Sequence, residues 1–180
     1  MSTSVLQQNI VRICGRQIDL CVPRMDDTDL MKYCHWVNNI NVAALIGRSG
    51  IITRPELLKD SFLQTGRILL NIARKGENSI IGFATIDYKA QTRTAVLGVV
   101  IGEQTLWNKG YGSEVTQLLV DFCRSEQNAH RIVWISYSDN PHAIKCAQSA
   151  GFRICVVEHE SEFHHGNYHD RIILEIICNQ

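Results

Sequence analysis

The sequence has no excess of charge of either sign, because its 18 Lys and Arg residues balance its 18 Asp and Glu residues. This balance gives no indication of a polyanionic partner such as nucleic acid. There is no signal peptide and no apolar run of about 18 residues, so we expect a cytoplasmic protein without membrane contacts. The seven cysteines form no CxxC pair, and their odd number favours free, buried thiols over a disulfide framework.

The absence of repeats and of a long linker predicts one domain over residues 1–180. The pattern predicts an α/β fold of the α+β type, with an antiparallel meander in a mixed sheet of about seven strands flanked by helices. Thr53 and Glu56 have the spacing of a capping box, with Pro55 in the first turn. We expect strands within 11–22 (two short runs) and at 68–73, 80–88, 92–101, 131–137, 155–158 and 171–177, and helices at 26–38, 53–64, 113–126 and from 141 onward.

The most informative segment is Leu97–Asp121, where an apolar strand is followed by a turn with Gly110 and Gly112 and then by an amphipathic helix. The first N–H groups of a helix are free and its dipole favours negative charge, while glycine lets a pyrophosphate touch the backbone. We therefore predict a phosphate-bearing ligand at Trp107–Ser113. The apolar stripe of the helix is Val115, Leu118, Leu119 and Phe122.

Two nucleotide-binding alternatives are weaker. A Walker A loop requires Lys and Ser or Thr directly after its last glycine, whereas Gly112 is followed by Ser113 and Glu114. A dinucleotide fingerprint requires a third glycine where the sequence has Val115. The early antiparallel strands also disfavour a doubly wound nucleotide-binding protein.

Four segments together resemble the RimJ/RimL-like branch of the GNAT N-acetyltransferases. They are the loop W-x-K-G-Y-G-x-E at 107–114, the Asn-led helix ending in Gly-Phe at 140–152, the G-x-Y-x-D string at 166–170, and a W-x-N segment at 36–39. The resemblance covers most of the chain. It implies the GNAT fold, with the parallel neighbouring strands 96–101 and 131–137 splayed apart, and acetyl-CoA as cosubstrate.

The resemblance implies that acetyl-CoA binds along the glycine loop. A backbone N–H near Val99 to Ile101 would bind the thioester oxygen. Asn140 would lie near the pantetheine or the thioester and would also cap its helix. Lys109 is either a salt partner of a phosphate or a solvated charge, and Trp107 is more a packing residue than a ligand. The loop residues implied in binding are Trp107, Asn108, Lys109, Gly110, Tyr111 and Gly112.

The resemblance also implies direct attack of an amine on acetyl-CoA in a ternary complex, which needs a base. Aligned on the Gly-Phe and GNYHD strings, Glu162 falls where the ribosomal-protein branch has a catalytic carboxylate. The alternative is that Glu162 is a solvated carboxylate like Glu158 and Glu160. The Glu that many GNATs carry on the strand before the loop is here Val96.

The general acid is not evident in the sequence. The positions where relatives place a Tyr or a Ser are Ala147 and Ala143, while Ser136, Tyr137 and Ser149 are nearby. A water molecule, or direct proton transfer, would also serve. The missing hydroxyls leave open a second class of function, a CoA-binding sensor that has lost catalysis.

The acceptor is expected to be a primary amine, either a protein N-terminus or a small molecule such as an amino sugar, a polyamine or an aminoglycoside. We expect Trp36, Tyr168 and Asp170 to contact it, within a wall built by 36–60 and the start of the last hairpin. No metal is predicted, since His159, His164, His165 and His169 form no tight motif and have no accompanying cysteine. Cys146 and Cys155 are expected to be buried, and a homodimer is compatible with the family.

Overall fold

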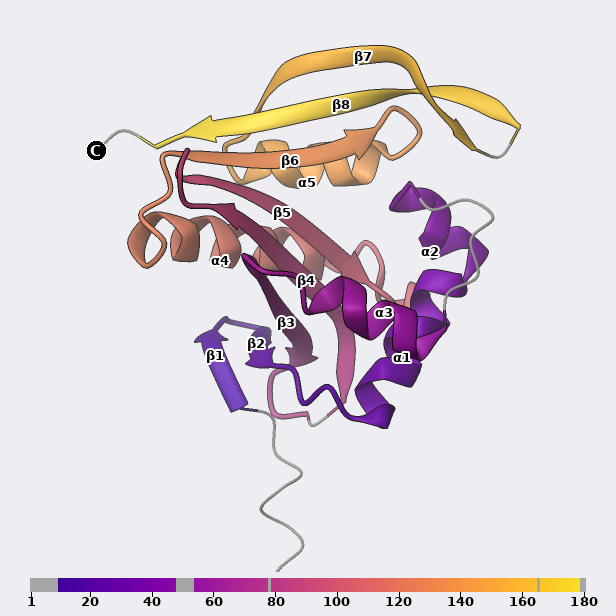
Figure 1. The fold of residues 1–180 in the computed structure, drawn as a ribbon, viewed down its shortest axis with the longest axis vertical. Helices are drawn as coiled ribbons and strands as arrows, with labels where there is room; N and C mark the ends of the chain where they lie inside the picture. The colour runs from indigo at the N-terminus through magenta and orange to yellow at the C-terminus, as the bar shows by residue number, and fades with distance from the viewer. Residues whose placement is uncertain (1–9, 48–53, 78, 165, 179–180) are drawn as a thin grey trace, which may run out of the picture.

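The protein is described by a computed structural model over residues 10–47, 54–77, 79–164 and 166–178 (Figure 1). Eight strands form one sheet in the order β1-β2-β3-β4-β5-β6-β8-β7. The paired strands are antiparallel except β5 and β6, which are parallel. The elements are β1 (Ile10–Cys14), β2 (Ile18–Val22), α1 (Asp27–Asn38), α2 (Ile40–Leu45), α3 (Pro55–Phe62), β3 (Arg67–Arg74), β4 (Ile80–Lys89), β5 (Thr94–Ile101), η2 (Gln104–Leu106), α4 (Tyr111–Ser125), β6 (Arg131–Tyr137), α5 (Pro141–Ser149), β7 (Arg153–His164) and β8 (Asn167–Ile177).

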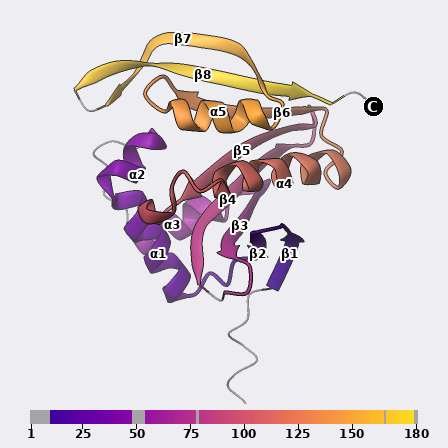
Figure 2. The same cartoon turned by 180° about the vertical axis from the view of Figure 1, so that it is seen from behind.

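Helices cover both faces of the sheet. Helices α4 and α5 lie on one face, while α1 and α3 lie on the other (Figures 1 and 2). Side chains alternate along a strand, so Ala95 and Leu97 of β5 pack in the core cluster of α4. Val100 of the same strand packs with α1 and α3 in a second cluster that is rich in aromatic rings. The buried faces of β5 therefore fix the strand between two apolar layers.

The parallel strands β5 and β6 part before they end. Their pairing runs from Thr94↔Arg131 to Leu97↔Trp134, although β5 continues to Ile101 and β6 to Tyr137. Each strand keeps its outer partner over this stretch, because β4 pairs with β5 up to Ile101 and β8 pairs with β6 up to Tyr137. The predicted parallel pair and its splay are thus confirmed.

The eight strands correspond to the eight runs expected along the chain, although the sheet was predicted to have about seven strands. The closing hairpin is longer than predicted. Strand β7 extends to His164, so that Glu162 belongs to a strand. Strand β7 lies at the edge of the sheet, and most of its residues are exposed. An exposed strand lacks the alternation of apolar and polar residues that marks a half-buried strand, so its full length could not be predicted. The short helix α2 was also not predicted.

The predicted capping box of α3 is not part of the described helix. Helix α3 starts at Pro55, and its N-cap is Arg54, which makes no side-chain capping bond. Thr53 lies outside the described residues. The position of Pro55 as the first helical residue agrees with its fixed backbone angle and missing N–H.

A bulge in β7 determines where Glu162 lies. The register passes from Glu158↔Arg171 to Glu162↔His169, so the intervening residues of β7 face Asp170 alone. Glu160 adopts a φ of 49°, and its N–H donates to Asp170 Oδ1 at 2.9 Å. This backbone hydrogen bond lowers the pKa of Asp170. Asp170 is therefore a structural residue that holds the bulge next to Glu162.

All seven cysteines are free thiols, but not all of them are buried. Cys155 is exposed on the edge strand β7, so the prediction that it is a buried hydrophobe is wrong. Cys146 is partly buried. Within the described residues, no helix has the length and apolar character needed to cross a membrane.

Candidate active site

A cavity of about 1200 Å³ opens where β5 and β6 separate. The last residues of both strands line it, Gly98–Ile101 from β5 and Trp134–Tyr137 from β6. The glycine loop and α5 line it on one side of the sheet, and residues of α1, α2 and α3 line it on the other. The cavity therefore passes between the two strands. This shape suits a long, narrow ligand.

The N-terminus of α4 faces this cavity without a capping side chain. Its N-cap is Gly110, with a φ of 85°, and the first bond of the helix runs from Glu114 N–H to the Gly110 carbonyl at 3.1 Å. By contrast, the carboxylate of Asp26 caps α1. The N–H groups before Glu114 on α4 are thus available to an anion, where the helix dipole also favours negative charge.

Gly112 lies in the first turn of α4 and lines the cavity. A β-carbon built on it would lie 3.8 Å from Cys146 Sγ, which is an ordinary contact. Packing within the chain therefore does not require glycine at this position. The absence of a side chain instead leaves the backbone open to a ligand that enters between α4 and α5.

The other loop residues divide between structural contacts and the cavity wall. The indole N–H of Trp107 donates to the Ile101 carbonyl at 2.7 Å, which ties the loop to the end of β5. Trp107, Asn108 and Tyr111 all line the cavity. Lys109 is exposed and lines a neighbouring hollow of about 650 Å³ together with Arg16. The structure thus places Lys109 at the edge of the loop, beside a second basic residue.

The register of β5 shows which of its N–H groups face the gap. Gly102 N–H donates to the Ile81 carbonyl at 2.9 Å, so this pair is hydrogen-bonded in the β4–β5 ladder. Hydrogen-bonded and non-bonded pairs alternate in an antiparallel ladder. Val99 and Ile101 therefore direct their N–H groups away from β4, toward the space between β5 and β6. Both are placed to donate to a bound carbonyl oxygen.

Asn140 and Glu162 both line the cavity. Asn140 is 8% exposed, and its Oδ1 accepts from Ala143 N–H at 3.2 Å as the N-cap of α5. Its Nδ2 donates to the Leu45 carbonyl at 3.3 Å, which joins α5 to the end of α2. Asn140 therefore holds two walls of the cavity together. Glu162 is half-buried, and it is the register partner of His169 in the β7–β8 hairpin.

Three hydroxyls that the sequence could not orient line the cavity: Ser136, Tyr137 and Ser149. Burial raises the pKa of Tyr137, and the negative charge of Glu162 raises it further. The phenol of Tyr137 is therefore protonated at neutral pH, close to Glu162. Ala143 also lines the cavity, whereas Ala147 is fully buried in the core.

The residues predicted to contact the acceptor are not among those that line the cavity in the described part of the chain. Trp36 is 2% exposed in the core, where its ring covers Gly102 and its Nε1–H donates to Glu103 Oε1 at 3.2 Å. Tyr168 is 65% exposed and packs on Phe163. The segment after Trp36 does supply cavity residues, namely Val37, Val42, Leu45, Ile46 and Leu58.

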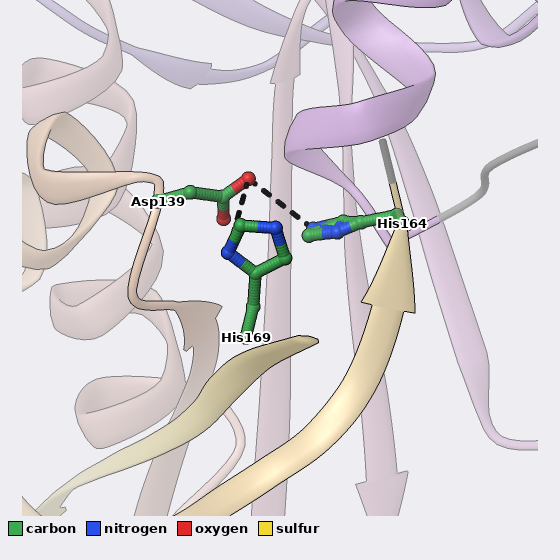
Figure 3. A group of neighbouring side chains, drawn as sticks. All are labelled: Asp139, His164 and His169. Atoms are coloured by element: carbon green, nitrogen blue, oxygen red, sulfur yellow. Dashed lines mark ion pairs between the residues drawn. The ribbon is translucent and has the colours of Figure 1, made fainter. Parts of the chain in front are cut away.

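The fold also brings together a cluster that includes the cavity residue Asp139 and that the sequence did not predict. Figure 3 shows Asp139, His164 and His169 directed toward one another from the β6–α5 turn, the end of β7 and the start of β8. Asp139 Oδ2 lies 3.2 Å from His164 Nε2 and 3.9 Å from His169 Nδ1. The two histidines are far from Asp139 in sequence, so only the fold could reveal the group. His165 lies outside the described residues.

Glu114, the last residue of the loop string, has a structural role. Its Oε1 accepts the N–H groups of Arg16 at 2.5 Å and of Gln17 at 2.8 Å, in the turn between β1 and β2. Burial alone would raise the pKa of Glu114, but these backbone hydrogen bonds outweigh it and the pKa is lowered. The carboxylate thus anchors the first hairpin to the helix of the glycine loop.

We expect Glu114→Ala to lower the free energy of unfolding by about 2 kcal/mol at neutral pH, because it leaves backbone N–H groups without a charged acceptor. A lowered pKa means that this stabilisation is present above the ordinary value of 4.5 and is lost as the pH falls through the lower, folded-state value. Urea unfolding of both proteins across this range measures the difference. Asp60→Ala, at an exposed carboxylate of α3, is the control and should change stability little.

The splayed strands and the uncapped helix start of α4 border one cavity, whose geometry suits a long ligand with a phosphate group. Residues 19–153 match the sequence profile of the acetyltransferase (GNAT) domain. Because this match covers well over half of the sequence, the chain belongs to the GNAT acetyltransferase family.

Solved structures have the same fold. The fold is similar to spermidine N-acetyltransferase from Vibrio cholerae in complex with CoA and spermine (TM-score 0.80, 18% identity, 89% of this chain and 95% of that chain). It is also similar to the microcin C7 self-immunity acetyltransferase MccE in complex with acetyl-CoA and AMP (0.74, 18%, 91% and 94%). A third is a proposed ribosomal-protein-serine acetyltransferase from Vibrio cholerae (0.70, 14%, 95% and 99%).

Proposed function

We propose that this chain is an N-acetyltransferase that moves the acetyl group of acetyl-CoA to a primary amine, of which a protein N-terminal α-amine is the first candidate. The observation that carries the proposal is the cavity between β5 and β6, which is lined both by the uncapped N-terminus of α4 and by Glu162. The donor and a proton acceptor are thereby brought to one space. Direct attack in a ternary complex needs both.

In this proposal the pyrophosphate binds the N–H groups at the start of α4, and the pantetheine arm enters between β5 and β6. The thioester oxygen accepts a hydrogen bond from the N–H of Val99 or Ile101, which stabilises the negative charge that forms on attack. A donor of this kind commonly lowers the activation free energy by about 3 kcal/mol. Asn140 connects α5 to the end of α2 through its hydrogen bonds to Ala143 and Leu45, and so holds two walls of the cavity together.

Glu162 takes the proton of the attacking amine, either directly or through one water molecule. Tyr137 gives a proton to the departing thiolate, since its raised pKa keeps the phenol protonated. We expect Tyr137→Phe to lower kcat by about 100-fold while the KM for acetyl-CoA changes little. Ser149→Ala, another cavity hydroxyl, should leave kcat nearly unchanged. If the two variants exchange these effects, Ser149 is the acid.

The lining favours an acceptor with an apolar portion next to its amine. The walls supplied by α1, α2 and α3 are aliphatic and aromatic, with Val37, Val42 and Phe62 among them. The N-terminal residues of a protein could meet this requirement. A small polycationic amine is the second candidate, because Asp139 and Glu162 place two carboxylates on the cavity wall.

The experiment is calorimetric titration of acetyl-CoA into the protein, followed by detection of the acetylated product by mass spectrometry. Product detection is preferable to a disulfide reagent for released CoA, because Cys14 and Cys155 are exposed thiols that would react with it. The amine panel contains short peptides with free N-termini, spermidine, glucosamine and an aminoglycoside. Acetylated peptides support the first candidate, and acetylated spermidine alone supports the second. Binding of acetyl-CoA without any product would contradict the enzyme and indicate a sensor.

A further inference from the structure

We propose that Asp139, His164 and His169 bind one divalent transition-metal ion of the zinc class. The three side chains supply two imidazole nitrogens and one carboxylate oxygen, and their ligand atoms all lie within 4.8 Å of one another (Figure 3). Two imidazoles and a carboxylate form a donor set that zinc binds in proteins, with water completing the coordination. The site borders the cavity through Asp139, but the proposal does not rest on the acetyl transfer.

The distances from the Asp139 carboxylate to the two imidazoles are close to those of an occupied site. Metal–ligand bonds of about 2.1 Å in a tetrahedron place two ligand atoms about 3.4 Å apart. Asp139 Oδ2 lies 3.2 Å from His164 Nε2 and 3.9 Å from His169 Nδ1. The second distance would shorten by about half an ångström on binding, which is within the reach of a side-chain rotation.

Burial and ring packing also favour a metal. The side chain of His164 is 3% exposed, that of His169 is 17% exposed and that of Asp139 is 27% exposed. The two rings meet edge to face with their centroids 4.1 Å apart, so both lie close enough to reach one ion. Nε2 of His169 is buried and has no hydrogen-bond partner among the described residues.

The register of the hairpin explains why the cluster forms. Glu162 pairs with His169 and His164 pairs with Asn167, so His164 lies diagonally across from His169 on the same face. Asp139 reaches this face because Ser138 continues the pairing of β6 with β8, through the bond from Ser138 N–H to the Asp170 carbonyl at 2.9 Å. An ion bound here would join the tip of the last hairpin to the turn that precedes α5.

The test uses untagged, chelator-treated protein titrated with Zn²⁺, and separately with Mg²⁺. We expect one Zn²⁺ per chain at this site and a rise in Tm, and no response to Mg²⁺, which prefers oxygen ligands. Asp139→Asn and His169→Asn should each weaken Zn²⁺ binding at least tenfold, since loss of outer-shell partners alone already has such effects. His130→Asn and Asp60→Asn, at exposed positions elsewhere, are the matched controls.

Co²⁺ in place of Zn²⁺ distinguishes this site from the free cysteines. Nitrogen and oxygen ligation by the cluster gives a visible Co²⁺ spectrum without the near-ultraviolet band of thiolate ligands, and His169→Asn should remove it. His169 and Asp139 are not fully buried, so their variants should keep the fold, which circular dichroism checks. Equal Zn²⁺ affinity in the wild type and both variants, a thiolate band, or no binding would each overturn the proposal.

Discussion

Gly112→Trp should weaken acetyl-CoA binding at least 100-fold, which corresponds to about 2.7 kcal/mol, while the protein remains folded. The backbone at Gly112 lines the cavity at the uncapped start of α4. An indole there would occupy the space through which the pyrophosphate approaches the N–H groups of the helix. Calorimetric titration of acetyl-CoA measures the loss.

The fold should tolerate this change because Gly112 is not tightly enclosed. The nearest atom to a β-carbon at this position is Cys146 Sγ at 3.8 Å, and the φ of Gly112 is not in the left-handed region. Ser125→Trp, at the exposed last residue of the same helix, is the control for a surface tryptophan and should bind acetyl-CoA as the wild type does. Unchanged affinity in Gly112→Trp would remove the glycine loop from the binding site.

The central fold could be predicted from the sequence because its strands and helices carry clear periodicity. The meander, the crossover from β5 through α4 to β6 and the glycine loop between them are all local patterns joined by one handedness rule. The splay was implied only by the resemblance, since no side chain encodes where pairing stops. It becomes visible in the register, which ends at Leu97↔Trp134.

The acceptor side of the site was harder to predict, because it is built from contacts between distant segments. Trp36 belongs to the W-x-N segment by which the chain resembles the family, and it was predicted to contact the acceptor. Its position in the core depends on its contact with Gly102, just after β5. The structural role of Asp170 depends on a bulge in β7, which no local sequence pattern indicates. Asp139 and Tyr137 enter the site only because β6 and the last hairpin pair side by side.

Glu162→Gln should lower kcat/KM by about 100- to 10,000-fold at neutral pH and leave the affinity for acetyl-CoA unchanged. Glutamine has nearly the shape of glutamate but cannot take the proton of the attacking amine. Glu162 lines the cavity from β7, whereas the proposed pyrophosphate site is at the start of α4, so its loss should not disturb the donor. Steady-state kinetics with the best amine of the panel, together with calorimetry, separates the two effects.

The loss should become smaller as the pH rises, because an α-amine with a pKa of about 8 is then increasingly neutral without the help of a base. Glu160→Gln is the matched control, since Glu160 lies two residues away on the same strand and its side chain is exposed. It should keep the activity of the wild type at every pH. Full activity of Glu162→Gln, or an equal loss in both variants, would show that the base is another group, and the remaining carboxylate on the cavity wall, Asp139, would be tested next.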